Sequence, residues 1–472
     1  MLAHLGCFAV KRGAIERLDP KFIILGGHQK LSHSSVASLG SLVMQEPDYG
    51  APCRAVPRKD DEIKYIRITD FNEFGISNDH EFMTAEVVDD RFILEDGDIL
   101  FARSGATAGK TFLYSSDIGP AIFAGYCIRF RFDRRLVDPE FIYLYTKTGR
   151  YYAWVQSIQR PSGQPNINKE EFKSFTIPLT NRVKQRILVN ALNGARLEHQ
   201  RMLKDADDLL AGLDGFILDV LGLTLPQPDT RTVYAVRAMD TQKSKKLYPD
   251  YFHPERTTTI KAIETRYKGS SVSRLIDVAD FMRDQCIVSP DDNYLGLANI
   301  QPNTGELVES TEKDGKGNCF KYIEGDVLFA RLRPYLNKVY RAESDGVCST
   351  EFHVIRVHKD QNNKDRLIPD YLAAVLRSSL VLSQTRHMMT GNTHPRLTNE
   401  DVVNLMIPKP DRSIQMIIAA EVARRRVKAR QLRNDADSLW MEAKHRFEEE
   451  LLGPEPPPEE LKTAVKKRGG GK

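Results

Sequence analysis

The residues that come closest to a catalytic motif are Ser104 to Thr111, which read Ser-Gly-Ala-Thr-Ala-Gly-Lys-Thr. A phosphate-binding loop needs Gly-x-x-x-x-Gly-Lys-Ser/Thr after a strand, because its backbone amides cradle the phosphates and its lysine reaches the terminal ones. Here serine replaces the first glycine, and no partner strand ending in a magnesium-binding aspartate is evident. A P-loop-like NTPase therefore stays an alternative interpretation.

Two sets of acidic residues and lysines have the loose spacing of a metal-dependent nuclease. They are Asp48 with Glu62 and Lys64, and Asp291 with Asp314 and Lys316. Spacings this loose arise often by chance, so a nuclease is a second enzymatic alternative. A DNA methyltransferase would need an Asn/Asp-Pro-Pro-Tyr/Phe motif to hold a flipped base, and the chain lacks one. Any S-adenosylmethionine would have to be bound by a partner, and no cofactor is expected on this chain.

The composition predicts a folded protein of several domains. Its 472 residues exceed the ~100–200 of an ordinary domain. Hydrophobic residues make up 41% and charged residues 28%, which excludes a wholly disordered or coiled-coil-only chain. The net charge of +4 is too small to identify a nucleic-acid partner by itself.

The cysteines and the apolar runs give further expectations. The six cysteines show no CxxC pair or zinc-ligand spacing, so we expect reduced core thiols and no metal. No apolar run approaches the ~18–20 residues that cross a membrane, and the first ten residues do not resemble a secretory signal. We therefore expect a cytoplasmic protein with no membrane partner.

The elements that would position these loops occur twice. Gly97-Asp98-Ile99-Leu100-Phe101-Ala102-Arg103 returns 228 residues later as Gly325-Asp326-Val327-Leu328-Phe329-Ala330-Arg331. Pro165 returns as Pro395 and Ile177-Pro178 as Ile407-Pro408, both 230 residues later. The loops after the shared strand differ, because Ser104–Lys110 is rich in glycine whereas Leu332–Lys338 contains none. This pattern indicates two related modules that recognise different things.

Each module is predicted to be rich in short strands and to end in a long helix. After Ile177-Pro178, apolar residues from Leu188 to Val220 step by 4 and 3, and the second copy repeats this from Ile418. His199 lies on this seam, and we expect it to pack there. A helix over 182–222 would be on the order of 60 Å long, and two such helices are expected to pair antiparallel and hold the modules in pseudo-two-fold relation.

Together these features resemble the specificity (S) subunits of type I restriction–modification enzymes over nearly the whole chain. The resemblance rests on the doubled Gly-Asp-(Ile/Val)-Leu-Phe-Ala-Arg, the Ser162-Gly163-Gln164-Pro165-Asn166-Ile167 turn, the strand openings Tyr65-Ile66-Arg67 and Tyr294-Leu295-Gly296, and the two long helices. It implies a non-catalytic, sequence-specific DNA-recognition subunit that binds an asymmetric two-part site in double-stranded DNA. It also implies that the chain binds methyltransferase (M) subunits, which are expected to be two and to carry the S-adenosylmethionine. Restriction (R) motor subunits are a further implied partner.

The predicted fold is α/β (mixed α+β), with two tandem target recognition domains and two long antiparallel coiled-coil helices in a pseudo-two-fold repeat. The expected ranges are 1–181 for the first domain, 182–222 for the first helix, 223–240 for a linker, 241–410 for the second domain, 411–452 for the second helix and 453–472 for a disordered tail. The second module has Gly391-Asn392-Thr393-His394-Pro395-Arg396 in place of the first module's turn, so its contacts with DNA are expected to differ.

DNA reading needs Lys and Arg for phosphates, Arg for guanine and Asn or Gln for adenine, all on exposed loops. In the first module the candidates are Arg103, Ser104, Thr107, Lys110, Gln164 and Asn166. In the second they are Arg331, Arg333, Tyr335, Asn337, Lys338, Asn392, His394 and Arg396. Each could instead be a solvated loop residue. Arg103 and Arg331 are shared, so phosphate or structural roles are expected for them and base reading for the divergent positions. A protein-binding scaffold whose helices carry the function is a third alternative.

Overall fold

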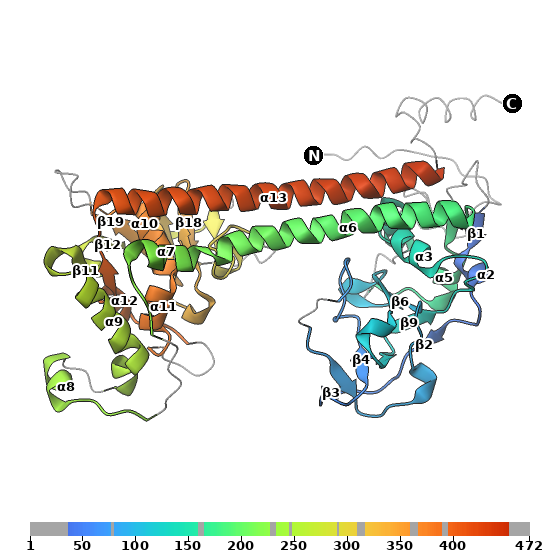
Figure 1. The fold of residues 1–472 in the computed structure, drawn as a ribbon, viewed down its shortest axis with the longest axis horizontal. Coiled ribbons are helices and arrows are strands. Elements are labelled where there is room, and N and C mark those ends of the chain that lie inside the picture. The colour runs from blue at the N-terminus through green and yellow to red at the C-terminus, as the bar shows by residue number, and fades with distance from the viewer. Residues whose placement is uncertain are drawn as a thin grey trace. The chain divides into compact units, whose positions relative to one another are not determined.

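The computed structural model describes residues 36–76, 80–158, 165–226, 233–244, 248–289, 292–308, 317–358, 367–388 and 395–452. Two compact units divide the chain. Unit 1 combines the residues up to Met202 with those from Asn434 onward, and unit 2 is Leu203–Arg433. Each unit contains one of the two predicted modules and part of each long helix (Figure 1).

Unit 1 consists of a series of short strands, followed by three short helices and a last strand before its long helix begins. Its strands are β1 (Val36–Ser38), β2 (Asp48–Tyr49), β3 (Ala55–Pro57), β4 (Lys64–Ile66), β5 (Met83–Ala85), β6 (Ile99–Ala102), β7 (Thr111–Leu113), β8 (Ala121–Phe123), β9 (Cys127–Phe130) and β10 (Thr176–Pro178). Its helices are α2 (Leu39–Leu42), α3 (Pro139–Tyr145), α4 (Gly149–Ile158), α5 (Lys169–Ser174) and the first part of α6 (Arg182–Ala211). The mixed α+β class predicted from the sequence is confirmed.

Unit 2 has a matching succession of strands along the chain, but helices precede its first strand. Its strands are β11 (Val272–Arg274), β12 (Ala279–Met282), β13 (Gln285–Ile287), β14 (Tyr294–Leu295), β15 (Asn318–Tyr322), β16 (Val327–Ala330), β17 (Val339–Arg341), β18 (Gly346–Ser349), β19 (Phe352–Val357) and β20 (Met406–Pro408). Its helices are α7 (Leu213–Leu221), α8 (Ala238–Ser244), α9 (Pro254–Arg266), α10 (Pro369–Arg377), α11 (Ser379–Thr385), α12 (Asn399–Val403) and the first part of α13 (Arg412–Leu452).

The sheets show how closely the two modules match. Unit 1 has one sheet of order β2-β9-β6-β7, and unit 2 has its counterpart β12-β19-β16-β17. A two-stranded antiparallel pair, β1-β10 or β11-β20, accompanies each. Each unit has a second four-stranded sheet, which we call its outer sheet, and these two sheets differ. In the order β3-β5-β4-β8 of unit 1, β4 lies between β5 and β8, whereas in the order β13-β15-β18-β14 of unit 2, β18 lies between β15 and β14. The strands that carry the repeated Gly-Asp motif are therefore the more constant part of the scaffold.

The two long helices run antiparallel within each unit (Figure 1). In unit 1, Lys184 of α6 donates to the backbone carbonyl of Glu450 in α13. In unit 2, Asp207 of α6 pairs with Arg433 of α13 at 2.8 Å. The expected single helix over 182–222 is interrupted at Gly212, which separates α6 from α7. Glycine has low helix propensity because its backbone loses the most conformational freedom on folding.

The helix seam is part of the core of each unit. In unit 1, Leu188 and Leu192 are buried with Trp440 and Phe447 of α13 in the cluster that also covers the β6 sheet. His199 is 2% exposed and stacks on the ring of Phe74, with centroids 4.6 Å apart. The packing role expected for this histidine is therefore what the structure has.

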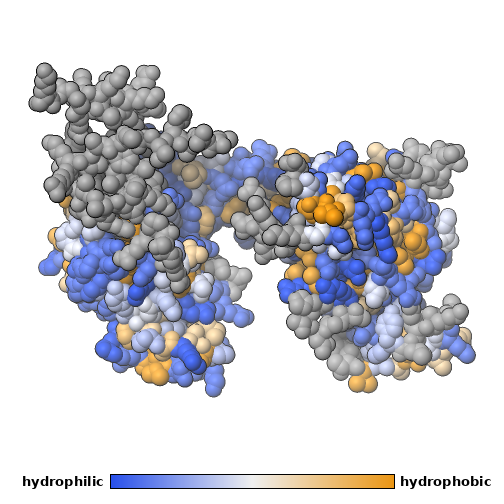
Figure 2. Space-filling view, turned by 180° about the vertical axis from the view of Figure 1, so that it is seen from behind, coloured by the Kyte–Doolittle hydropathy of each residue, from blue (hydrophilic) through white to orange (hydrophobic). Residues whose placement is uncertain are grey.

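On the coloured surface of Figure 2, hydrophilic side chains predominate, and apolar side chains form smaller areas between them. Among the described residues, no helix combines the length and apolar character that crossing a bilayer requires.

Candidate nucleic-acid interface

In unit 1 the loop after β6 is held by two other turns of the chain. The backbone N–H of Arg103 donates to the carbonyl of Tyr126, in the turn between β8 and β9, at 3.0 Å. Ile167, in the turn before α5, donates to the Arg103 carbonyl at 2.8 Å, and Ser104 forms a β-bridge with Asn166. Three segments that are distant in sequence therefore meet at one place, which we call the recognition edge of module 1.

Unit 2 builds its recognition edge from the equivalent three segments. Arg331 donates to the carbonyl of Glu351 at 2.9 Å, and Leu397 donates to the Arg331 carbonyl at 3.0 Å. Leu332 forms the β-bridge with Arg396. Each of these bonds has its counterpart 225 to 230 residues earlier in the chain. The repeat seen in the sequence thus extends to the hydrogen bonds that shape the loops.

Two predicted residues of module 1 touch at this edge. The Arg103 guanidinium lies 4.7 Å from the ring centroid of Tyr49, and its Nε donates to Asn166 Oδ1 at 3.4 Å. The ring and the amide hold the arginine in one orientation without neutralising its charge. Gln164, predicted from the same turn, lies outside the described residues.

The remaining predicted residues of module 1 lie along the loop itself. The Thr107 hydroxyl donates to the Ser104 carbonyl at 3.3 Å, which closes the 3-10 turn Gly105–Thr107. Lys110 is half-buried and directly precedes β7. Thr107 therefore has a turn-forming contact, and Lys110 lies where the loop re-enters the sheet.

Among the candidates of module 2 that the structure describes, the most exposed side chains are those of Arg333 and Tyr335. They belong to a tight turn around the 3-10 helix Pro334–Leu336. Arg333 and Asn337, on either side of it, both have φ of +49°, a left-handed conformation that non-glycine residues rarely adopt. Arg333 is exposed and Tyr335 is 48% exposed. The backbone thus presents an arginine and a tyrosine to solvent from a tightly constrained turn.

Asn337 and Lys338 instead hold this turn against the module. Asn337 Nδ2 donates to the Arg377 carbonyl at 2.6 Å, and Lys338 Nζ donates to the Leu297 carbonyl at 2.7 Å. Both partners are distant in sequence, so this positioning role was missed by the sequence reasoning.

Arg331 and Arg396 also lie at the recognition edge of module 2. Arg396 forms a two-point ion pair with Glu351, with its shortest contact at 2.7 Å. Arg331 Nε is buried, and no hydrogen-bond partner for it is found within the described part of the chain. Asn392 and His394 lie outside the described residues.

In each unit a buried basic side chain contacts the start of the strand that follows the loop after the repeated motif. In unit 1, Lys147 Nζ donates to the carbonyl and the hydroxyl of Thr111 at 2.9 and 3.1 Å. Burial lowers the pKa of Lys147 to about 7. In unit 2, Arg377 occupies the equivalent position and donates to the Val339 carbonyl at 3.4 Å, and burial lowers its pKa to about 10.

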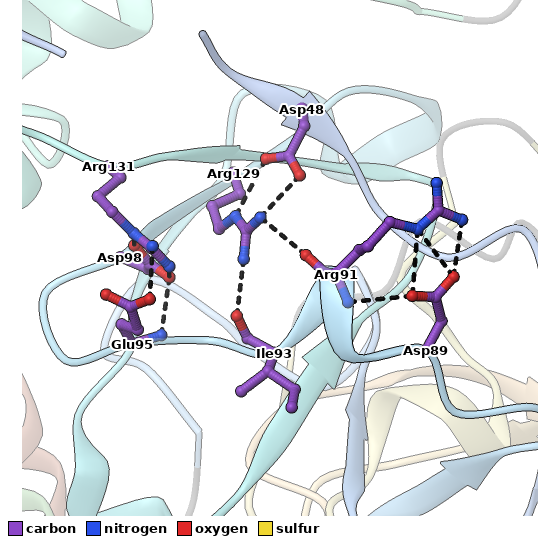
Figure 3. A network of polar contacts seen from close by, with 8 residues as sticks. All are labelled: Asp48, Asp89, Arg91, Ile93, Glu95, Asp98, Arg129 and Arg131. Atoms are coloured by element: carbon purple, nitrogen blue, oxygen red, sulfur yellow. Dashed lines mark hydrogen bonds and ion pairs between the residues drawn. The ribbon is translucent and has the colours of Figure 1, made fainter. Parts of the chain in front are cut away.

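The repeated Gly-Asp motif has a structural explanation that the sequence did not reveal (Figure 3). Arg131, directly after β9, donates to both carboxylate oxygens of Asp98 at 2.7 and 2.8 Å. Arg356 binds Asp326 in the same way, with both distances 2.7 Å. Both aspartates are 1% exposed. The conserved spacing of the repeat therefore reflects a buried ion pair that ties neighbouring strands together.

The side chains of the first candidate nuclease set each have other partners. Arg129 binds both oxygens of Asp48 and also donates to two backbone carbonyls (Figure 3). Glu62 accepts from the Lys59 backbone N–H at 2.9 Å, and Lys64 Nζ donates to the Ile118 carbonyl. These groups do not converge on one site. Asp291, Asp314 and Lys316 lie outside the described residues.

The P-loop-like stretch does not have the geometry of a phosphate cradle. Such a cradle requires a helix N-terminus directly after the lysine. Here Lys110 is followed by β7, which pairs antiparallel with β6. The nucleotide-hydrolysing alternative therefore lacks its essential element.

One group of potential metal ligands lies in unit 2. His253, Glu255 and His387 each offer a ligand atom within 4.8 Å of the others. However, the two imidazole rings are stacked at 3.4 Å with 17° between their planes, so their in-plane lone pairs do not converge on one point. Glu255 is also bound by His387 at 2.8 Å and Arg386 at 3.2 Å. This arrangement fits a cluster of ion pairs better than a metal centre.

Two residues at the recognition edges were not predicted. Tyr126 is 64% exposed beside Arg103. Its counterpart in module 2 is Glu351, whose carboxylate binds Arg396. Each lies directly before the strand that pairs with the strand of the repeated motif, β9 in unit 1 and β19 in unit 2. This position next to a predicted strand was the sequence signal that could have indicated them.

Comparison with known proteins gives one family match. Residues 52–193 match the model of the type I restriction modification DNA specificity domain. This range contains β6, the loop after it and the turn before α5, and thus all three segments of the recognition edge of module 1. No curated protein matches the chain.

Among the solved structures that are similar to the chain, three illustrate the likeness, all at low sequence identity. One is described as "Structural basis underlying complex assembly and conformational transition of the type I R-M system" and is 15% identical, covering 89% of this chain and 97% of its own, with a TM-score of 0.48. The HsdS subunit from Thermoanaerobacter tengcongensis is 15% identical, covering 91% and 100%, with a TM-score of 0.37. The type-I restriction-modification system S subunit from M. genitalium is 13% identical, covering 90% and 98%, with a TM-score of 0.42.

Proposed function

We propose that the chain is a DNA-recognition subunit of the type I restriction–modification DNA specificity family rather than an enzyme, and that its two modules divide the reading of DNA. The family model matches module 1. Module 2 repeats module 1 in its main sheet, its loop hydrogen bonds and its buried Asp–Arg pair. Both units are therefore treated as domains of the same kind.

Each module reads one part of an asymmetric two-part site in double-stranded DNA. The observation that carries this proposal is that one backbone arrangement supports two recognition edges with different side chains. Module 1 offers a glycine-containing turn with Tyr126 exposed beside it. Module 2 offers Arg333 and Tyr335 from a left-handed turn. A shared scaffold with different exposed groups favours two different base sequences.

The predicted DNA-contacting residues divide into readers and supports. Arg333 reads a base, because a guanidinium can donate two parallel hydrogen bonds to the O6 and N7 atoms of guanine. Tyr335 packs beside it on the sugar or base. Arg103 and Arg331 approach phosphates, as does Lys110. Asn337 and Lys338 act indirectly by holding the turn through Arg377 and Leu297.

The long helices bind two methyltransferase subunits. Ile187 of α6 is 59% exposed, and its repeat counterpart Ile417 of α13 is 53% exposed. Leu197 and its counterpart Val427 are 61% and 63% exposed. Exposed apolar side chains at matching positions of both units favour one copy of the same partner on each unit. Those partners supply the S-adenosylmethionine and the methyl transfer, and restriction subunits associate through the assembled complex.

The test is base-resolution methylation sequencing of cells with and without the gene, with a variant in one module. Deletion is expected to remove methylation from an asymmetric two-part motif. Arg333→Asn is expected to relax only the part read by module 2, at a cost of ~1–3 kcal/mol, since asparagine tolerates the left-handed backbone. Lys261→Ala removes an exposed cation of α9 and is the matched control. Equal relaxation of both parts by Arg333→Asn would contradict the division between the modules.

A further inference from the structure

Two cysteines face each other across neighbouring strands of the outer sheet of unit 2. Cys286 on β13 lies directly opposite Cys319 on β15 in an antiparallel pair. Their Sγ atoms are 3.0 Å apart, and Cys319 Sγ also donates to the Cys286 carbonyl at 3.2 Å. A disulfide has its sulfurs at ~2.05 Å, so about 1 Å of sulfur movement separates the thiols from a bond.

The two thiols differ in their access to solvent. Cys286 is half-buried, whereas Cys319 is buried. Burial, with the adjacent Cys286 sulfur, raises the pKa of Cys319 to about 12. Because the thiolate is the reactive form, the first reaction with a dissolved oxidant falls to Cys286.

We propose that Cys286 and Cys319 form an oxidisable thiol pair, which a small-molecule disulfide such as oxidised glutathione converts into an intramolecular disulfide within module 2. This modification is independent of DNA binding. Its consequence for DNA recognition, developed below, rests on the proposed function.

The reaction is a pair of thiol–disulfide exchanges. The Cys286 sulfur attacks one sulfur of the small-molecule disulfide, forms a mixed disulfide and releases one small thiol, which takes the Cys286 proton. Cys319 then attacks the Cys286 sulfur and releases the second small thiol, which takes the Cys319 proton. The protein pair loses two electrons and two protons, and the small-molecule disulfide is reduced to two thiols.

The segment between the two cysteines supports the recognition turn of module 2. The carbonyl of Leu297 accepts from Lys338 at 2.7 Å, and the backbone N–H of Asn303 donates to the Asn337 carbonyl at 3.2 Å. A disulfide at the base of this segment closes it covalently and removes conformational freedom from it. Oxidation is therefore expected to change how firmly the turn that carries Arg333 is held.

The same segment is anchored to α13. Glu306 binds Arg430 at 2.6 Å and also pairs with Arg426. The ion pairs of Glu306 thus already limit the movement of this segment. A disulfide between Cys286 and Cys319 would fix the segment at a second place, on the sheet. The expected effect on DNA binding is confined to module 2, because these contacts all lie in unit 2.

The chemical test uses the full-length protein in glutathione buffers of graded composition. After free thiols are alkylated, digestion without reductant and mass spectrometry identify the linked peptides. The expected product is a peptide pair joined through Cys286 and Cys319, lighter by two hydrogens, that is absent from Cys286→Ser. Cys53→Ser, which alters another half-buried thiol, should still form it. A stable mixed disulfide at Cys286, a link between two chains, or free thiols at every ratio would each overturn the proposal.

The functional test compares oxidised and reduced protein in its assembled complex with DNA altered in one half-site at a time. Oxidation is expected to change affinity for the half-site of module 2 several-fold and to leave that of module 1 unchanged, and Cys286→Ser should abolish the difference. An unchanged second half-site after complete cross-linking would overturn the link to recognition. If the reduced complex bound DNA altered in either half-site as tightly as unaltered DNA, the proposed function would be overturned instead. The mass spectrum would still test the thiol pair independently of DNA recognition.

Discussion

The repeated Asp–Arg pair allows a prediction in which one module is the control for the other. Asp326→Asn keeps the size of the side chain and one oxygen that can accept from the Ile323 backbone N–H, as Asp326 does now at 2.9 Å. It removes the charge that faces Arg356. Asp98→Asn makes the same change in module 1, but there Arg131 also contacts Glu95 at 2.6 Å.

The expected magnitudes follow from burial. Removing one partner of a fully buried ion pair costs about 3–5 kcal/mol, because the other charge is left unpaired. The Arg356 side chain is 25% exposed, so water partly solvates it, and we expect Asp326→Asn to cost about 2–3 kcal/mol. Asp98→Asn should cost about 1 kcal/mol less, because Arg131 keeps Glu95, whose side chain is 67% exposed.

Hydrogen–deuterium exchange measures each module separately. A loss of 2–3 kcal/mol corresponds to roughly 30- to 150-fold faster exchange in β16 and β19 when exchange follows local opening. Asp326→Asn should leave β6 and β9 unchanged, and Asp98→Asn should accelerate those strands by a smaller factor. Equal acceleration by the two variants would refute the compensating role assigned to Glu95.

Three further predictions concern the loops, the buried cation and the helices. Gly109→Ala should destabilise unit 1 by about 2–4 kcal/mol, seen as a lower Tm, because φ is +90° and the new Cβ would lie 2.6 Å from Val155. Because the pKa of Lys147 is lowered to about 7, the unfolded chain binds more protons than the folded one between about pH 7 and 10, and the free energy of unfolding should rise over that range. In urea unfolding, Lys147→Met should not show this rise. The same dependence of stability on pH in the variant would contradict the prediction. Ile187→Asp and Ile417→Asp should each cause the loss of one methyltransferase subunit from the complex, as measured by native mass spectrometry. Loss of both subunits from either variant would argue against two separate sites.

The sequence predicted the repeated scaffold well, because hydrophobic periodicity and the doubled motif are local signals. The second long helix was predicted over 411–452 and extends over Arg412–Leu452. The strands expected around Ile99 and Ile128 are β6 and β9. The first long helix, predicted over 182–222, corresponds to α6 and α7, which extend from Arg182 to Leu221; the apolar seam did not indicate that Gly212 separates them.

The recognition edges were predictable only in part. Residue type and loop position indicated Arg333 and Tyr335, which are exposed. The same signals also indicated Asn337 and Lys338, whose side chains hold the turn through backbone carbonyls 40 and 41 residues away. Such contacts depend on tertiary placement, and a single sequence does not reveal which polar side chain will be occupied. The DNA-contacting roles of these residues remain predictions.

Unit 1 is completed by the C-terminal part of α13, and this has a consequence for biosynthesis. Trp440, Phe447 and Leu451 belong to the same core as Leu188 and Leu192. At a synthesis rate of ~5–20 residues per second, roughly 12 to 50 seconds separate translation of the two groups. During that interval the seam of the first module is exposed to chaperones and proteases. A message truncated before residue 434 would therefore yield a chain whose first module lacks part of its core, and we expect cells to degrade it before it can direct modification to half of a site.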